Sequence, residues 1–266
     1  MPVIAIDFGG TNIKLGLIAE GGEVLVTSKL KAVADKSIQH GLDSVSEHIL
    51  ELFEQHNIST NSLTGIGIMV PSIVDTTNNK VLSKYVKYTD AHEFDFNAWA
   101  KQAWNLPVVV ANDAKAALIG EWQYGAGKDC DDLVMITLGT GVGTAVLSEG
   151  KLFKGKHYLG GNMGGHISIN MHGNPCNCGF FGCLETEAST WALPDLIKQH
   201  KNFESSSLSK INNPEFIHLF EEADKGDALA KNMVQHCLKA WGVCAVNMVH
   251  AYDPARIIIS GGIMKR

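Results

Sequence analysis

Three cysteines and one histidine lie close together between residues 166 and 183, in a spacing that suits a metal ion. His166, Cys176, Cys178 and Cys183 form the pattern H-x9-C-x-C-x4-C. Three thiolates and one imidazole can coordinate a tetrahedral Zn²⁺, and because protein ligands would fill all four positions, we expect a structural site. Free cysteines or a redox pair are the alternatives, and His172 is a rival nitrogen ligand.

A glycine turn near the N-terminus joins two runs of strand type. It consists of Gly9, Gly10 and Thr11. Backbone N–H groups of such a turn can approach phosphate oxygens, and Thr11 adds a hydroxyl donor. Asp7, which ends the preceding run, could hold Mg²⁺ directly or through water, and Lys14 could supply a positive charge. A tight hairpin turn without a ligand is the alternative.

A second turn of the same kind, Gly139, Thr140 and Gly141, follows the run LVMITL in the other half of the chain. Two such turns fit the opposite sides of one nucleotide's phosphates, so we expect a nucleotide as a ligand. Neither turn matches the P-loop pattern G-x-x-x-x-G-K-[ST]. Neither opens a helix within a β-α-β unit, which disfavours a dinucleotide-binding fold.

Asn112 and Asp113 stand where the apolar run LPVVVA meets the Ala-rich segment AKAALIGE. In α/β proteins the end of a buried strand is the rim of the ligand cleft. A carboxylate there can accept the proton of an attacking hydroxyl, while the neighbouring amide orients the substrate. The alternative is that one of the two residues only caps the helix.

The elements that must position these residues follow an α/β pattern, because apolar runs of strand length alternate with segments of helical period. The strand, glycine turn and strand of residues 4–18 recur at 131–147, which suggests a duplicated architecture with a cleft between two halves. We therefore expect a small N-terminal domain over residues 1–112 and a larger domain with the zinc loop over residues 113–266.

Composition excludes several classes of protein. The chain has 266 residues, a hydrophobic fraction of 45% and a formal net charge of −6, which argues against a protein whose main partner is a nucleic acid. No run approaches the roughly 18 apolar residues of a membrane span, and the N-terminus does not resemble a signal peptide. We therefore expect a cytoplasmic protein without a membrane partner.

The segments DFGGTNIK, VVANDAKAALIGE, TLGTGVGTAV, GGH, CNCGFFGCLE and IIISGG occur in this order. Together they resemble the ROK family (repressors, open reading frames, kinases). The resemblance implies an actin-like, ribonuclease-H-like duplicated fold with ATP between two domains, and a homodimer. It implies that Asp113 is the base for a hexose hydroxyl, usually O6, and that Asp7 lies near Mg²⁺. It also implies that Asn112, His166 and Glu185 bind the sugar, and that Gly261 and Gly262 lie near the adenosine. Glu187 is expected to be a plain surface charge.

The family divides into sugar kinases and sugar-responsive repressors, and the repressors carry a DNA-binding helix-turn-helix before the first strand. This chain starts at that strand, which disfavours a repressor. The two glycine turns, Asn112-Asp113 and the zinc cluster make a glucokinase-like kinase the leading hypothesis. Met163 replaces a glutamate that contacts the sugar, and Arg266 follows the Gly261-Gly262 turn so closely that we expect a shortened C-terminal domain. The alternatives are a non-catalytic sugar sensor, a kinase for N-acetylmannosamine or another hexose, a nucleotide-driven scaffold, and polyphosphate as the donor.

Overall fold

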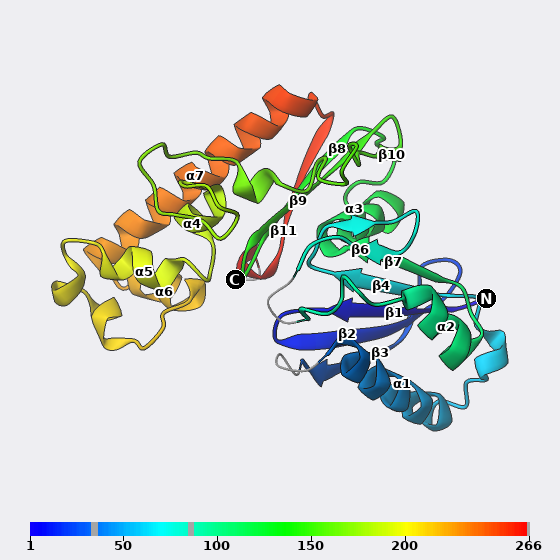
Figure 1. Cartoon of the computed structure of the whole chain (residues 1–266). Helices are drawn as coiled ribbons and strands as arrows, with labels where there is room; N and C mark the ends of the chain where they lie inside the picture. Colours follow the sequence, from blue (N-terminus) through cyan, green and yellow to red (C-terminus); the bar gives the residue numbers. More distant parts are fainter. Residues whose placement is uncertain (33–36, 85–87, 265–266) are drawn as a thin grey trace. The chain divides into compact units, whose positions relative to one another are not determined.

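The chain folds into two compact α/β units (Figure 1). The computed structural model describes residues 1–32, 37–84 and 88–264. Unit 1 comprises Met1–Ala117 and unit 2 comprises Leu118–Arg266. In the described part of the chain, no helix combines the length and the hydrophobicity that a membrane crossing requires.

Unit 1 is built on a five-stranded sheet with the order β3-β2-β1-β4-β7. The first three strands form antiparallel pairs, whereas β4 is parallel to both β1 and β7. A separate short hairpin is made by β5 and β6. The strands are β1 (Val3–Phe8), β2 (Asn12–Ile18), β3 (Val24–Lys31), β4 (Ile66–Val70), β5 (Val74–Asp75), β6 (Lys80–Val81) and β7 (Val108–Asn112).

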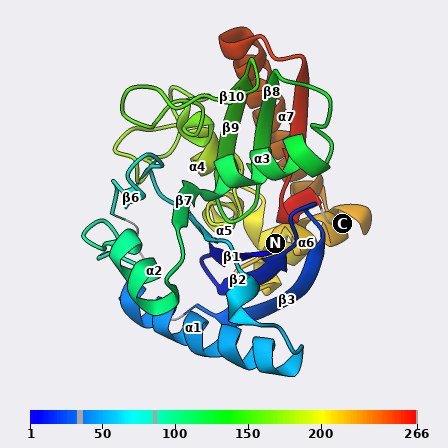
Figure 2. The ribbon, with the colours of Figure 1, turned by 90° about the vertical axis from the view of Figure 1, so that its right-hand side faces the viewer.

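One face of this sheet forms the core of unit 1. Alternate residues of β1, namely Ile4, Ile6 and Phe8, are buried there, because successive strand side chains point to opposite faces. Helices α1 (Ile38–Gln55) and α2 (Phe96–Trp104) pack their apolar stripes against this face (Figure 2). Asp7 and its cross-strand partner Lys14 therefore point to the other face.

The parallel strands bring three sequence segments to one edge of the sheet. Asp7 of β1 is in register with Met69 of β4, and Met69 is in register with Ala111 of β7. Helix α3 (Asp113–Tyr124) follows β7 without a loop. The end of β1 and the start of α3 consequently lie at the same edge of the sheet.

Unit 2 repeats the beginning of this topology with the order β10-β9-β8-β11. As in unit 1, a glycine turn joins two antiparallel strands, and the first of these also pairs with a parallel strand. The expected α/β class and the duplicated arrangement are therefore confirmed. The strands are β8 (Leu133–Leu138), β9 (Val142–Ser148), β10 (Lys151–Leu152) and β11 (Arg256–Ser260).

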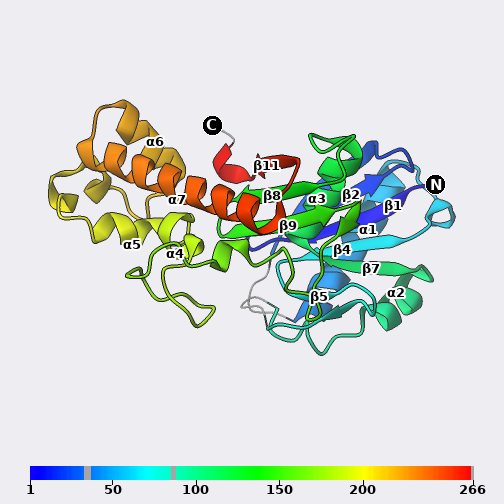
Figure 3. The same cartoon turned by 90° about the horizontal axis from the view of Figure 1, so that it is seen from above.

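The long helix α7 (Ala228–Tyr252) organises the helical part of unit 2. Its buried side chains, including Met233, Cys237 and Met248, join a core with the inner face of β8. Two other helices, α4 (Leu184–Ala188) and α6 (Phe216–Asp224), pack against α7 (Figure 3). The remaining helix is α5 (Leu193–Lys198), and 3-10 turns cover Thr60–Ser62, Gly164–His166, Phe203–Ser205, Ser207–Lys210 and Gly262–Met264.

Candidate active site and metal centre

Asn112, and not Asp113, caps the start of α3. Asn112 Oδ1 accepts the backbone N–H of Lys115 at 3.1 Å, which is the bond of a helix cap. Its amide group donates to the carbonyl oxygen of Ser72 at 3.2 Å and to Asp113 Oδ1 at 3.1 Å. Because Asn112 does the capping, the carboxyl group of Asp113 is not needed for that role.

The carboxyl group of Asp113 is perturbed by its surroundings. Burial is the main cause that raises its pKa from 3.8 to about 6, and the nearby carboxylate of Asp7 acts in the same direction. The N–H of Ala114 donates to Asp113 Oδ1 at 2.8 Å and partly opposes this rise. A carboxylate with a pKa near 6 is a better proton acceptor at neutral pH than an ordinary aspartate, and it is still ionised there.

The first glycine turn places Asp7 and Lys14 on either side of it. Lys14 Nζ lies 2.9 Å from Asp7 Oδ2, and the Lys14 side chain is 70% exposed. Gly9 N–H donates to the carbonyl oxygen of Asp7, and the carbonyl oxygen of Thr11 accepts the N–H of Ala32, the residue after β3. Thr11 is exposed, whereas Gly10 is partly buried. The turn and Asp113 thus lie at the same end of the parallel strands of the unit 1 sheet.

The second glycine turn is braced by Glu185 of α4. Glu185 Oε2 accepts the N–H of Val142 at 3.0 Å, and Oε1 accepts the indole N–H of Trp191 at 3.1 Å. The carbonyl oxygens of Gly139 and Thr140 accept backbone N–H groups of Thr190 and Trp191. The side chain expected to bind sugar is therefore also a support of the expected phosphate turn.

A side chain at position 141 would crowd the carboxylate of Glu185. A Cβ atom there would lie 2.7 Å from Glu185 Oε2. On the other side of β8, Ser260 of β11 is in register with Thr137, so Gly261 and Gly262 follow at the same end of the sheet. The second turn, Glu185 and the double glycine are consequently brought together within unit 2.

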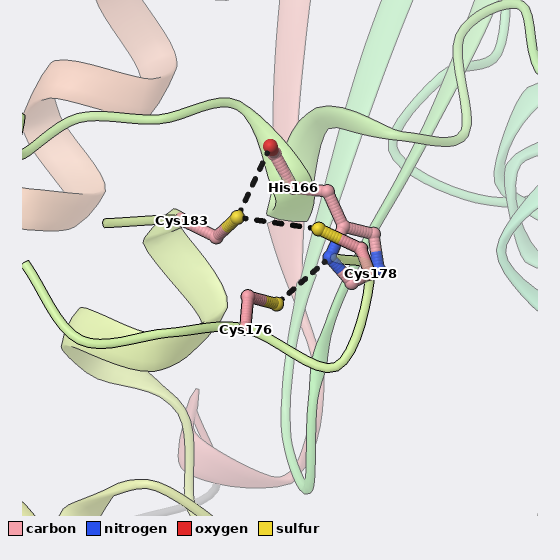
Figure 4. Close-up of side chains that lie close together, drawn as sticks. All are labelled: His166, Cys176, Cys178 and Cys183. Carbon is pink, nitrogen blue, oxygen red and sulfur yellow. Dashed lines mark hydrogen bonds between the residues drawn. The ribbon is translucent and has the colours of Figure 1, made fainter. Parts of the chain in front are cut away.

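His166, Cys176, Cys178 and Cys183 form one cluster (Figure 4). Their potential ligand atoms all lie within 4.8 Å of one another. His166 Nδ1 is 3.5 Å from Cys176 Sγ, and the sulfur atoms of Cys178 and Cys183 are 3.6 Å apart. Cys183 is fully buried, whereas Cys178 is exposed. His172 is not a member of this cluster.

The cluster fits a tetrahedral Zn²⁺. Bond lengths of about 2.3 Å to sulfur and about 2.1 Å to nitrogen place neighbouring ligand atoms about 3.6 to 3.8 Å apart, close to the two distances above. Burial and the neighbouring thiols raise the pKa of Cys183 to about 12, so this thiol keeps its proton unless a cation is present. Metal binding would release that proton.

Glu187 is not the surface charge that the sequence suggested. It is 4% exposed, and its Oε1 accepts from Asn170 Nδ2 at 3.3 Å. His236 of α7 approaches Oε2 to 3.5 Å. The expectation was wrong because α4 packs between α7 and the metal loop, which is the segment from His166 to Cys183 that carries the four candidate ligands. Two residues advance about 200° around a helix, which could have indicated that Glu185 and Glu187 face different neighbours.

Met163 precedes the 3-10 turn that ends at His166. Thr144 of β9, which the sequence did not single out, is completely buried and holds the segment before this turn. Its hydroxyl donates to the carbonyl oxygen of Gly161 and accepts the N–H of Gly164, both at 2.8 Å. A buried threonine in a strand gives no signal of such a contact in the sequence.

Comparisons with known proteins agree on one family. The ROK family model matches residues 3–266. The chain is 31% identical to a glucokinase of Thermotoga maritima over 271 residues, which covers 100% of this chain and 83% of that protein. It is 30% identical to a glucokinase of Halalkalibacterium halodurans, with 98% and 80% covered. The structure of a ROK family glucokinase from Streptomyces griseus in complex with glucose and AMPPNP matches with a TM-score of 0.80 and 30% identity, over 99% of this chain and 84% of that chain.

Proposed function

Because the chain belongs to the ROK family and is a sugar kinase with the actin-like ATPase fold, we propose that it transfers the γ-phosphoryl group of ATP to O6 of glucose, with Asp113 as the base. The glucokinases that it resembles support glucose as the acceptor. The structure bound to glucose and AMPPNP supports an adenine nucleotide as the donor.

The observation that carries the proposed mechanism is the environment of Asp113. Asp113 begins α3 directly after β7, the pKa of its carboxyl group is raised to about 6, and the capping role is taken by the neighbouring Asn112. A group with these properties is ionised at neutral pH and can accept the proton of a sugar hydroxyl during the reaction. Positioned bases typically contribute about 10²- to 10⁴-fold to the rate.

The proposed step is an in-line displacement. One oxygen of the Asp113 carboxylate accepts the proton of the sugar 6-hydroxyl as O6 forms its bond to the γ-phosphorus atom. The bond between that phosphorus and the β,γ-bridging oxygen breaks, and ADP leaves with the electron pair. The products are the sugar 6-phosphate, ADP and protonated Asp113, which returns its proton to water.

The other residues have binding roles in this proposal. The two glycine turns offer backbone N–H groups to the phosphates, and Gly261 and Gly262 border the adenosine. Asp7 would hold Mg²⁺, which neutralises charge on the phosphates when bound. Asn112, His166 and Glu185 would bind sugar hydroxyls. Glu185 can do so because a carboxylate has about four acceptor positions and two of them are used here.

We also propose that His166, Cys176, Cys178 and Cys183 hold a structural Zn²⁺, which would connect both ends of the metal loop to α4 when bound. Metal analysis of the purified protein should find about one zinc ion per chain. Cys176→Ser should lose it, whereas Cys130→Ser should keep it, since Cys130 lies outside the cluster. A wild-type protein without zinc after refolding in its presence would contradict this proposal.

A phosphorylation screen tests the kinase proposal. ADP release should be measured with ATP or polyphosphate as the donor, and with glucose, mannose, fructose, allose, N-acetylglucosamine, N-acetylmannosamine and a β-glucoside as acceptors. We expect the highest kcat/KM with glucose and ATP. 6-Deoxyglucose is the matched control for O6, because it keeps every other hydroxyl group. Equal turnover of glucose and 6-deoxyglucose would refute phosphorylation at O6.

A further inference from the structure

Helix α4 is a short helix whose C-terminal end is held by side chains of α7. Trp241 donates its indole N–H to the carbonyl oxygen of Ala188 at 2.9 Å. His236 Nε2 lies 3.1 Å from the carbonyl oxygen of Glu187. Helix ends leave such carbonyl groups without partners inside the helix. The position of α4, and with it that of Glu185, therefore depends on α7.

The side chain of Glu187 extends this connection to the metal loop. Its carboxylate is buried between Asn170 Nδ2, at 3.3 Å from Oε1, and His236 Nε2, at 3.5 Å from Oε2. Space for it exists because residue 173 is glycine, where a Cβ atom would lie 2.3 Å from Glu187 Oε1. An apolar side chain could fill this space as well, so packing alone does not explain a carboxylate.

Asn170 contacts both Glu187 and the segment that carries the metal ligands. Backbone N–H groups of Ile169 and Asn170 both donate to the carbonyl oxygen of Gly182, at 2.8 and 3.2 Å. Gly182 has a φ of +62° and packs so closely on Asn170 that a Cβ atom would meet its carbonyl oxygen at 1.6 Å. The next residue is the ligand Cys183. A displacement of Asn170 would therefore be transmitted to this ligand.

From these contacts, we propose that Glu187 is a positioning residue that, together with His236, holds the metal loop in the geometry that binds Zn²⁺. This inference rests on the zinc site proposed above. A buried carboxylate is unfavourable unless it is paired and hydrogen-bonded. The imidazole of His236 faces this carboxylate, with Nε2 3.5 Å from Oε2. The pair therefore stabilises one arrangement of the loop instead of merely filling space.

The rate of zinc release to a chelating dye tests this role without sugar or nucleotide. Glu187→Ala removes both contacts, whereas Glu187→Gln retains the acceptor for Asn170 and provides a variant that packs like the wild type. We expect release to be about tenfold faster in Glu187→Ala, as for partners that support metal ligands, and less accelerated in Glu187→Gln. Glu204→Gln, an exposed change in the same unit, should match the wild type.

Two further measurements separate positioning from a general loss of stability. The increase in Tm on adding zinc should be smaller in Glu187→Ala than in the wild type. If Glu187 only stabilised the fold, its replacement would lower the Tm equally with and without zinc, and the increase would stay the same. His236→Ala should also accelerate release, and the two effects should not add fully in the double variant, because each substitution removes the contact between His236 and the Glu187 carboxylate. Wild-type release rates in both Glu187 variants would overturn the inference. A wild type that binds no zinc would overturn it together with the metal proposal, independently of any kinase assay.

Discussion

Replacing Asp113 by Asn should make the protein less active and, at neutral pH, more stable. The amide is nearly isosteric, and its oxygen can still accept the N–H of Ala114. It cannot accept a proton from a hydroxyl group, so kcat should fall about 10²- to 10⁴-fold. In the wild type, kcat/KM should rise with pH through an apparent pKa of about 6, because only the ionised carboxylate acts as a base.

The expected gain in stability follows from the same pKa. Between pH 3.8 and about 6, a larger fraction of Asp113 is protonated in the folded protein than in the unfolded chain. Stability from this group is therefore present at low pH and lost as the pH rises through that interval. The difference between the two pKa values corresponds to about 3 kcal/mol of unfavourable free energy for the ionised form. Asp113→Asn removes this term, since an amide does not ionise.

Thermal unfolding at pH 4 and pH 8, together with initial rates, provides the assay. The Tm of Asp113→Asn should exceed that of the wild type by several degrees at pH 8 and differ little at pH 4. Asp43→Asn, an exposed change on α1, is the control and should alter neither property. Full activity in Asp113→Asn would refute the assignment of the base. A loss of activity with no pH-dependent gain in Tm would refute the account of a buried, destabilised carboxylate.

Three other substitutions have defined outcomes. Asp7→Asn should move the acidic limb of the kcat/KM profile of the wild type to lower pH, because it removes the negative charge that adds to burial in raising the pKa of Asp113; an unchanged limb would contradict this. Gly141→Ala should raise the KM for ATP at least about tenfold, because its Cβ would lie 2.7 Å from Glu185 Oε2 and would disturb a charge-assisted hydrogen bond. Gly242→Ala in α7, whose Cβ would meet nothing within 4 Å, should leave this KM unchanged and raise Tm by about 2 to 4 °C; a lower Tm would refute it.

Local patterns were sufficient to predict much of the fold and the groups of candidate residues. Each glycine turn lies between two antiparallel strands as expected, because apolar alternation and turn chemistry act over a few residues. The spacing of His166 and the three cysteines likewise indicated a cluster that the fold does assemble. The assignment of Asp113 as a base, by contrast, remains a prediction.

Contacts between segments that are distant in the chain could not be predicted from the sequence. Nothing near Glu185 shows that its carboxylate meets the N–H of Val142, and nothing near Glu187 shows that His236 lies beside it. The division of tasks between Asn112 and Asp113 depends on side-chain directions at one turn of helix. Such contacts are set by packing, which a periodic pattern of apolar residues does not specify.

The order of strands in each sheet also determines when that sheet can form during synthesis of the chain. The sheet of unit 1 is complete once β7 has emerged at Asn112, whereas the β8–β9 hairpin of unit 2 must wait for Arg256–Ser260 before Leu133 obtains its parallel partner. Pairing between such distant residues is slow, and chains fold from the N-terminus as they are made. On the ribosome, a folded unit 1 should therefore precede a unit 2 whose central strand remains open on one side. In this interval, the nascent chain should depend most on chaperones.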